Sequence, residues 1–235
     1  MGKLIPRFGI VLQILFVVIV VSIIYQWKTN LSNSWPDGFS QPTVALELAS
    51  SVTTAHQTLQ LLGPQGVKRQ HQALIADSIA FIPLYWVVLS SLGAILTYRR
   101  IRFAGSAGIL VIVLVTAAAI FDYRENSGIA KILGAYPNDP SFALVEATRT
   151  ASLTKWSLIF AASAVSSLLF LPRADWIGLV GVYQFVVAAM GLIGVISRHT
   201  IIELATALMT INLLLIGMSF SSKRYYRDFY WSYAS

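Results

Sequence analysis

Six long apolar segments constrain the fold of this chain more than any other feature of its sequence. A helix needs about 20 predominantly apolar residues to cross a hydrocarbon core about 30 Å thick. Segments of this kind occur at Phe8–Trp27, Ser78–Tyr98, Phe103–Phe121, Leu153–Leu171, Trp176–Ile196 and Thr200–Phe220. The sequence therefore predicts an all-α bundle of six transmembrane helices, in a single integral membrane domain that covers residues 1–235.

The composition excludes several classes of protein. Hydrophobic residues make up 56% of the 235 residues and charged residues only 11%, against about 45–50% and 25% in soluble domains. A soluble fold or a disordered chain does not have this composition. The net charge of +7 does not indicate nucleic-acid binding, because the basic residues lie at the ends of the apolar segments. With no cysteine, the chain has no disulfide and no thiolate ligand.

The basic residues predict an orientation in the membrane. If the N-terminus is cytoplasmic, the short cytoplasmic connections and the chain ends carry basic residues directly beside spans, as at Arg99, Arg100 and Arg102. Most of the acidic residues then fall on the opposite side. Because short basic loops stay in the cytoplasm, we expect both termini to be cytoplasmic. The first segment has no small-residue cleavage site and is expected to remain as an anchor.

The first long outer loop, residues 28–77, contains a helical pattern. Ser40 is a candidate cap and Pro42 suits a first turn, whereas Gly63 and Pro64 are typical of a helix end. Apolar residues recur at helical spacing between them. We therefore expect one helix that lies on the bundle or in the membrane interface. Beyond it, Gly66–Ile75 is expected to run helically into the second span.

The second long outer loop, residues 122–155, is predicted to be irregular in its first half. Gly134, Pro137 and Pro140 interrupt any regular element there. The remainder, Ser141–Lys155, could form a second short interfacial helix that starts at Ser141 or at Asp139. The prediction is thus one or two extracytoplasmic helices in addition to the spans.

Polar residues near the outer ends of the spans form the candidate binding site. Ionisable groups at membrane depth are expensive and often functional. Asp122, Glu125 and Asn126 share one helix face, and Pro83 predicts a bend in the second span. The candidate residues are Asp77, Tyr85, Asp122, Glu125, Asn126, Lys155, Arg198, His199 and Glu203. The simpler interpretation is that each residue solvates a helix end, with pairs such as Asp77–Lys155 or Glu125–Arg198 holding the bundle together.

Signatures of enzymes and metal sites are missing from the sequence. The chain has no nucleophile elbow, no phosphate-binding loop and no dinucleotide fingerprint. His56, His71 and His199 lack the spacing of a helical metal site, so no metal site is predicted and no cofactor is identified. Haem ligation by two of the histidines remains open on residue type alone.

Four short patterns resemble a family of uncharacterised small polytopic bacterial integral membrane proteins. The patterns are Glu47-Leu48-Ala49-x-Ser51, Asp77-x3-Phe81-x-Pro83-x-Tyr85, Asp122-x2-Glu125-Asn126 and Lys155-Trp156. The resemblance covers about residues 44–160. It implies the bacterial cytoplasmic (inner) membrane as the location, and it implies no reaction, because the family has no settled activity.

Two functions from different classes follow from these observations. The favoured hypothesis is a non-catalytic membrane subunit or scaffold that binds a partner complex, a pigment or a lipid. The alternative is a membrane enzyme that acts on a lipid or isoprenoid-like substrate, with an acidic residue of the candidate cluster as general acid or base. The expected partners are membrane lipids and either other membrane subunits or a hydrophobic ligand, with no nucleic acid.

Overall fold

The computed structural model describes residues 35–97, 104–172, 174–197 and 201–221, together with Ile10, Gln13, Ile14 and Val17. Five helical segments of this part are long and apolar enough to cross a membrane. They are Val52–Thr97, Ala104–Ala135, Phe142–Leu169, Trp176–Ser197 and Ile201–Ser221. The chain is thus a polytopic helical membrane protein with five candidate spans. The predicted first span, Phe8–Trp27, lies outside the described residues except for the four isolated positions.

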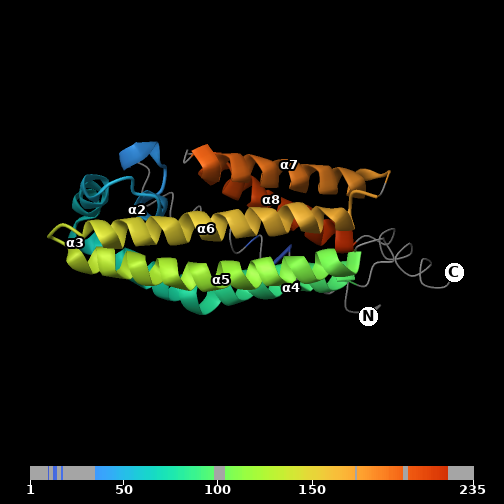
Figure 1. Cartoon of the computed structure of the whole chain (residues 1–235), viewed down its shortest axis with the longest axis horizontal. Helices are drawn as coiled ribbons and strands as arrows, with labels where there is room; N and C mark the ends of the chain where they lie inside the picture. Colours follow the sequence, from blue (N-terminus) through green and yellow to red (C-terminus); the bar gives the residue numbers. More distant parts are fainter. Residues whose placement is uncertain are drawn as a thin grey trace.

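The helices form a long bundle with a small assembly at one end (Figure 1). In chain order they are η1 (Pro36–Gly38), α2 (Pro42–Glu47), α3 (Val52–Ala76), the π-helical turn η2 (Asp77–Phe81), α4 (Ile82–Thr97), α5 (Ala104–Ala135), α6 (Phe142–Ser166), η3 (Ser167–Leu169), α7 (Trp176–Ser197) and α8 (Ile201–Ser221). Helices α4, α5 and α6 run side by side, and α7 packs on α6 and α8. We call η1, α2 and α3 the cap, and α4–α8 the membrane bundle.

The membrane bundle has an apolar core to which all five of its helices contribute. Buried side chains from α4 to α8 include Leu92, Val115, Ala162, Ile177 and Phe220. Large apolar side chains are also exposed around the bundle, as a surface in contact with lipid requires. At Gly108 the backbones of α4 and α5 are close, because a Cβ there would overlap the Gly93 carbonyl oxygen and Thr97.

The cap packs on the far ends of α5 and α6 through a second apolar core. Leu46 and Leu59 of the cap are buried against Ile129 and Ile132 of α5 and Val145 of α6. Helix α5 therefore extends past the predicted end of its span, and α6 begins before the predicted start of its span.

This continuation corrects the predicted third span and second outer loop. Helix α5 runs to Ala135 rather than ending at Phe121, and α6 already begins at Phe142, so most of residues 122–155 are helical. The helix passes through Asp122 and Glu125 because these side chains are buried against α6 instead of being solvated at a helix end. The predicted start at Ser141 is confirmed, since its hydroxyl accepts the Leu144 N–H.

The prediction of one helix between Pro42 and Gly63 is wrong, because the structure divides this segment between two helices, whereas the helical structure predicted for Gly66–Ile75 is confirmed. Helix α2 ends at Glu47, and α3 begins at Val52, where the Ser51 hydroxyl accepts the Thr54 N–H as an N-cap. The predicted break at Gly63 is confirmed by its φ of +61°, which favours glycine. Helical structure then resumes at Pro64, which suits a first turn.

Pro83 was predicted to bend the second span, and the structure has a π-helical turn just before it. Proline has no N–H to donate to the carbonyl four residues earlier. The preceding residues, Asp77–Phe81, adopt wider π geometry, in which the Ile82 N–H donates to the Asp77 carbonyl. A π-helical turn inside an α-helix often marks a functional position, and here it holds Asp77 and Ser78 toward α5.

Candidate functional site

Two facing helices, α5 and α6, hold the charged residues of the candidate site. Asp122, Glu125 and Asn126 lie on one face of α5, at a spacing of three and four residues. Lys155 projects from α6 and is only 4% exposed, whereas Glu125 is 1% and Asp122 4% exposed. Lys155 does not begin a span, as the sequence suggested, but lies well inside α6. The hairpin of α5 and α6 thus brings these groups together away from water.

Lys155 is surrounded by three carboxyl groups. Its Nζ lies 2.7 Å from Glu125 Oε1, 3.3 Å from Asp122 Oδ1 and 3.8 Å from Glu47 Oε2. The same Nζ is 4.6 Å from the ring centroid of Trp156, within the range of a cation–π contact. We call Glu47, Asp122, Glu125 and Lys155 the charge cluster. It joins the cap to both helices of the hairpin.

Asp77 belongs to a neighbouring polar group rather than to an ion pair with Lys155. Asn126 Nδ2 donates to Asp77 Oδ2 at 2.6 Å and to Ser78 Oγ at 3.0 Å. The Tyr123 hydroxyl donates to the Ser78 carbonyl at 3.0 Å. The predicted Asp77–Lys155 pair is therefore wrong. The π-helical turn is what places Asp77 and Ser78 within reach of α5.

Tyr85 lies beside the charge cluster, as predicted. Its hydroxyl is buried close to Asp122 without the geometry of a hydrogen bond. Its ring packs against Phe81, with the two ring centroids 5.7 Å apart. Tyr85 thus closes the side of the cluster that faces α4.

The charge cluster contains more acid than base. Three carboxyl groups face one ammonium group, and Glu47 Oε2 and Glu125 Oε2 accept no hydrogen bond. A buried excess of negative charge is costly and favours proton uptake. Burial raises the pKa of Glu47 above its ordinary value of 4.5, and the opposing effect of Lys155 is smaller. Glu47 therefore holds its proton to a higher pH than a carboxyl group in water.

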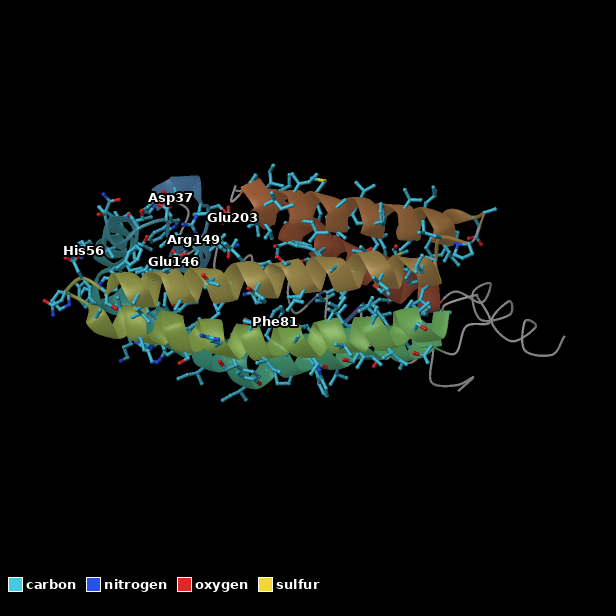
Figure 2. All side chains as sticks on the ribbon, in the orientation of Figure 1. Asp37, His56, Phe81, Glu146, Arg149 and Glu203 are labelled. Carbon is cyan, nitrogen blue, oxygen red and sulfur yellow. The ribbon has the colours of Figure 1, made fainter. Side chains whose placement is uncertain are left out.

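Glu203 does not belong to the cluster, although the sequence placed it there. Its carboxylate accepts the Ser40 N–H at 3.0 and 3.1 Å, the Ser40 hydroxyl at 3.1 Å and the Gln41 N–H at 3.3 Å. It therefore fastens α8 to the start of α2, where Figure 2 labels it near Asp37. Ser40 donates to Glu203 rather than capping α2 itself, so that expectation is wrong.

The remaining predicted residues divide into two groups. Arg198 and His199 lie outside the described residues. The predicted Glu125–Arg198 pair therefore stays a prediction. Of the other histidines, His56 lies on α3 and its Nδ1 is 2.7 Å from Asp139 Oδ1 in the α5–α6 turn. In the described part of the chain, no three His, Cys, Asp or Glu residues are placed to hold a metal ion together.

Glu47 is the member of the cluster that was not among the predicted site residues. The predicted acidic residues lie at the ends of apolar segments, whereas Glu47 lies in a helix predicted within the first outer loop. Two signals pointed to it: it is the only charged residue of the predicted outer helix, and it begins the first of the four short patterns. Glu47 is 7% exposed, and an acidic residue is rarely buried to this extent unless it has a partner such as Lys155.

Comparison with known proteins gives no match: no protein-family model, no curated protein and no solved structure matches this chain. The resemblance drawn from the four short patterns therefore identifies no family. What the structure supports is a polytopic helical membrane protein, with five candidate spans among the residues that it describes.

Proposed function

We propose that this protein is a non-catalytic integral membrane subunit or scaffold, which binds a partner complex, a pigment or a lipid through its apolar flanks and its cap. One observation carries the proposal: the charged groups of the cluster contact each other and are almost fully covered. Their exposed fractions lie between 1% and 7%. A catalytic acid or base must come within hydrogen-bond reach of its substrate, and these groups are occupied by one another.

The position of the cluster supports a role in assembly. It connects α2 to the hairpin of α5 and α6, which begins more than 50 residues later in the sequence. A buried ion network specifies one arrangement of such elements, because a displaced partner leaves a charge uncompensated. On this proposal the cluster fixes the cap on the membrane bundle and so presents a defined surface to a partner.

The proposal includes a location. We infer a bacterial cytoplasmic membrane with both termini in the cytoplasm. The distribution of basic residues beside the short connections supports this orientation, and the resemblance of the four short patterns supports a bacterial source. The cap would then lie on the extracytoplasmic side.

The test compares the natural protein with a variant that lacks charge in the cluster. Both are isolated from native membranes in mild detergent, and particle mass and partner content are measured. We design the variant as Glu47→Gln, Asp122→Asn, Glu125→Gln and Lys155→Met, since neutral replacement of a whole buried ion network is often tolerated. We expect both proteins to retain the same partner in a fixed ratio. A particle that contains the 25.8 kDa chain and no partner would contradict the proposal.

The enzyme hypothesis has one observation in its favour: Oε2 of Glu47 and Oε2 of Glu125 accept no hydrogen bond. A lipid or isoprenoid-like substrate could reach them only if the cap moved away from the hairpin. The uncharged variant separates the two functions. A folded variant that keeps its partner but loses a cellular phenotype indicates catalysis, whereas a folded variant that keeps both indicates a scaffold.

A further inference from the structure

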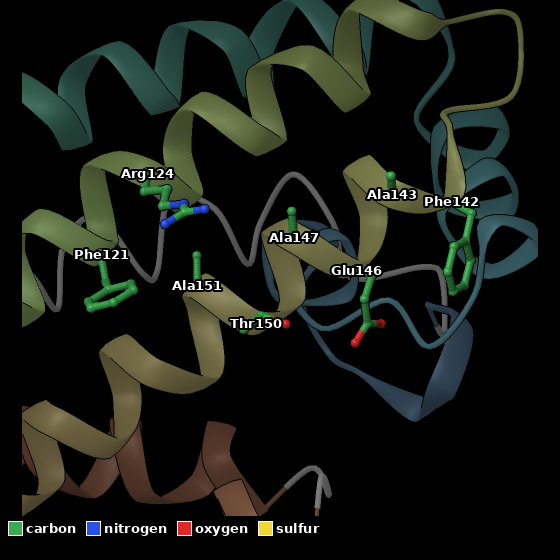
Figure 3. A pocket seen from close by; sticks show the side chains of 8 residues that line it. All are labelled: Phe121, Arg124, Phe142, Ala143, Glu146, Ala147, Thr150 and Ala151. Carbon is green, nitrogen blue, oxygen red and sulfur yellow. The ribbon is translucent and has the colours of Figure 1, made fainter.

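A groove of about 380 Å³ lies between α5 and α6, and no member of the charge cluster lines it. Figure 3 shows its lining side chains along both helices. Most of the lining is apolar, with Phe121, Phe142 and three alanines, and the polar members are Arg124, Glu146 and Thr150. A volume in the range of about 300–1,000 Å³ is typical of small-molecule sites.

Two opposite charges face this groove from different helices. Arg124 on α5 and Glu146 on α6 are both exposed. Among the described residues neither forms an ion pair with the other or with a third residue. An apolar groove with separate positive and negative groups suits a ligand that carries both charges and an apolar part.

The groove lies at the depth of a lipid head group. About 20 helical residues cross the hydrocarbon core. Counted from Ala104 on α5 and back from Leu169 on α6, the boundary falls near Arg124 and Thr150. Phe121 then faces the hydrocarbon, and Glu146 lies about one turn farther into the head-group region.

We propose that the groove binds a phospholipid whose head group carries a phosphate and a primary amine. Arg124 binds the phosphate, with the geometry that guanidinium groups favour, and Glu146 accepts the ammonium N–H groups. An acyl chain packs against Phe121. This inference rests on the proposed function and deepens it, because it names the class of lipid that the subunit binds.

Other phospholipids match the two charges less well. A choline head group has a positive charge but no N–H to donate to Glu146. A glycerol head group leaves the lipid anionic, and Glu146 then faces no positive group. We therefore expect phosphatidylethanolamine to bind better than phosphatidylcholine or phosphatidylglycerol.

The test uses the full chain in nanodiscs made of equal parts of these three lipids. After release into detergent, the lipids retained by the protein are counted by native mass spectrometry. We expect about fivefold more phosphatidylethanolamine than either other lipid, which corresponds to about 1 kcal/mol. Arg124→Gln and Glu146→Gln should each remove the preference. Lys131→Gln, two turns farther along α5 and outside the groove, should leave it unchanged.

A fourth variant reverses the selectivity. Glu146→Lys places two positive groups in the groove, so phosphatidylglycerol should become the preferred lipid. Equal retention of the three lipids by the natural protein, or no retained lipid, overturns the proposal, as does a preference that survives both glutamine variants. Partner retention is measured separately in mild detergent, so failure of the lipid proposal leaves the test of the subunit proposal unaffected.

Discussion

Lys155 illustrates how a charge is accommodated inside this protein. An isolated ammonium group buried at this depth would be expelled or neutralised, because desolvation costs several kcal/mol. Here two carboxyl oxygens lie within 3.3 Å of Nζ and a third at 3.8 Å. Each acid depends on the same single cation, so the four residues stabilise one another as a unit.

Because of this mutual dependence, alanine substitution of a buried acidic residue should lower the free energy of unfolding more than substitution of an exposed one. Asp122→Ala and Glu125→Ala should each lower the free energy of unfolding by about 1–3 kcal/mol, because a buried charged contact to Lys155 is lost while two other carboxyl groups still face its ammonium group. Asp139→Ala and Glu146→Ala, which remove the same charge from exposed positions, should each change it by about 1 kcal/mol or less, since the only ion pair lost among the described residues is the exposed one between Asp139 and His56. Thermal unfolding in detergent measures all four. Equal small effects would show that the cluster only solvates a helix end.

Glu47 makes the stability of the folded protein depend on pH. Because the pKa of Glu47 is raised in the folded state, its protonated form is favoured by folding. This contribution is complete below the unfolded value near 4.5 and is lost as pH rises through the folded pKa. Glu47→Gln removes the titration, so the stability of the variant relative to the natural protein should increase with pH above about 4.5.

The control for this prediction is Glu146→Gln, which removes an exposed carboxyl group. Its stability relative to the natural protein should stay nearly constant over the same pH range. The midpoint of thermal unfolding between pH 4 and pH 8 is the measurement. A parallel pH profile for Glu47→Gln and Glu146→Gln would contradict the role given to Glu47.

Most of the cluster could be predicted from residue type and span position alone. Asp122, Glu125 and Lys155 were predicted to lie at a similar depth in neighbouring spans, and they do contact one another. The sequence could not show that Glu203 turns to the cap, since its partners are backbone N–H groups of Ser40 and Gln41. Such partners leave no pattern in the side chains.

At the scale of elements, hydropathy locates the spans but not the ends of the helices. The apolar segment of α5 stops at Phe121, whereas the helix continues for another 14 residues to Ala135. Hydropathy reports where water or lipid surrounds a segment. It cannot report that Asp122 and Glu125 are covered by Lys155 of another helix, which is why residues 122–155 were expected to form a loop.

The contact between α4 and α5 offers a test with a matched control. Gly108→Ala should destabilise the bundle, because its Cβ would meet the Gly93 carbonyl and Thr97. Forced overpacking of this kind typically costs about 1–3 kcal/mol. Gly105→Ala, one turn earlier on α5, places its Cβ in open space. It should be neutral or stabilising by up to about 1 kcal/mol.

Thermal unfolding of both glycine variants in the same detergent provides the comparison. Helix propensity rises in both variants, and by less at Gly105, which lies in the first turn of α5, so a lower stability of Gly108→Ala would report the helix contact. If Gly108→Ala were as stable as Gly105→Ala, the close approach of α4 and α5 would be disproved.

At the scale of the whole molecule, the cap and the end of α8 should lie on opposite sides of the membrane. Ile201 begins α8 near the cap, where Glu203 contacts Ser40, and Ser221 ends it after 21 residues. The natural chain has no cysteine, so single cysteines are unambiguous probes. Ser50→Cys and Ser221→Cys are both at exposed positions and should react with an impermeant thiol reagent from opposite sides.

Intact cells or sealed vesicles, compared with permeabilised ones, provide the measurement. Labelling of Ser50→Cys without permeabilisation would place the cap outside the cell and support the proposed orientation. Labelling of both positions from one side would contradict the arrangement of α8.

The length of the hairpin determines how far the cap stands from the lipid. The 32 residues of α5 extend about 48 Å at about 1.5 Å per residue. That is about 18 Å longer than a hydrocarbon core of about 30 Å. The excess is braced by α6 and by the cluster, so the hairpin acts as a rigid spacer. A partner that binds the cap would be held at a constant height above the bilayer, whatever the thickness of the surrounding head groups.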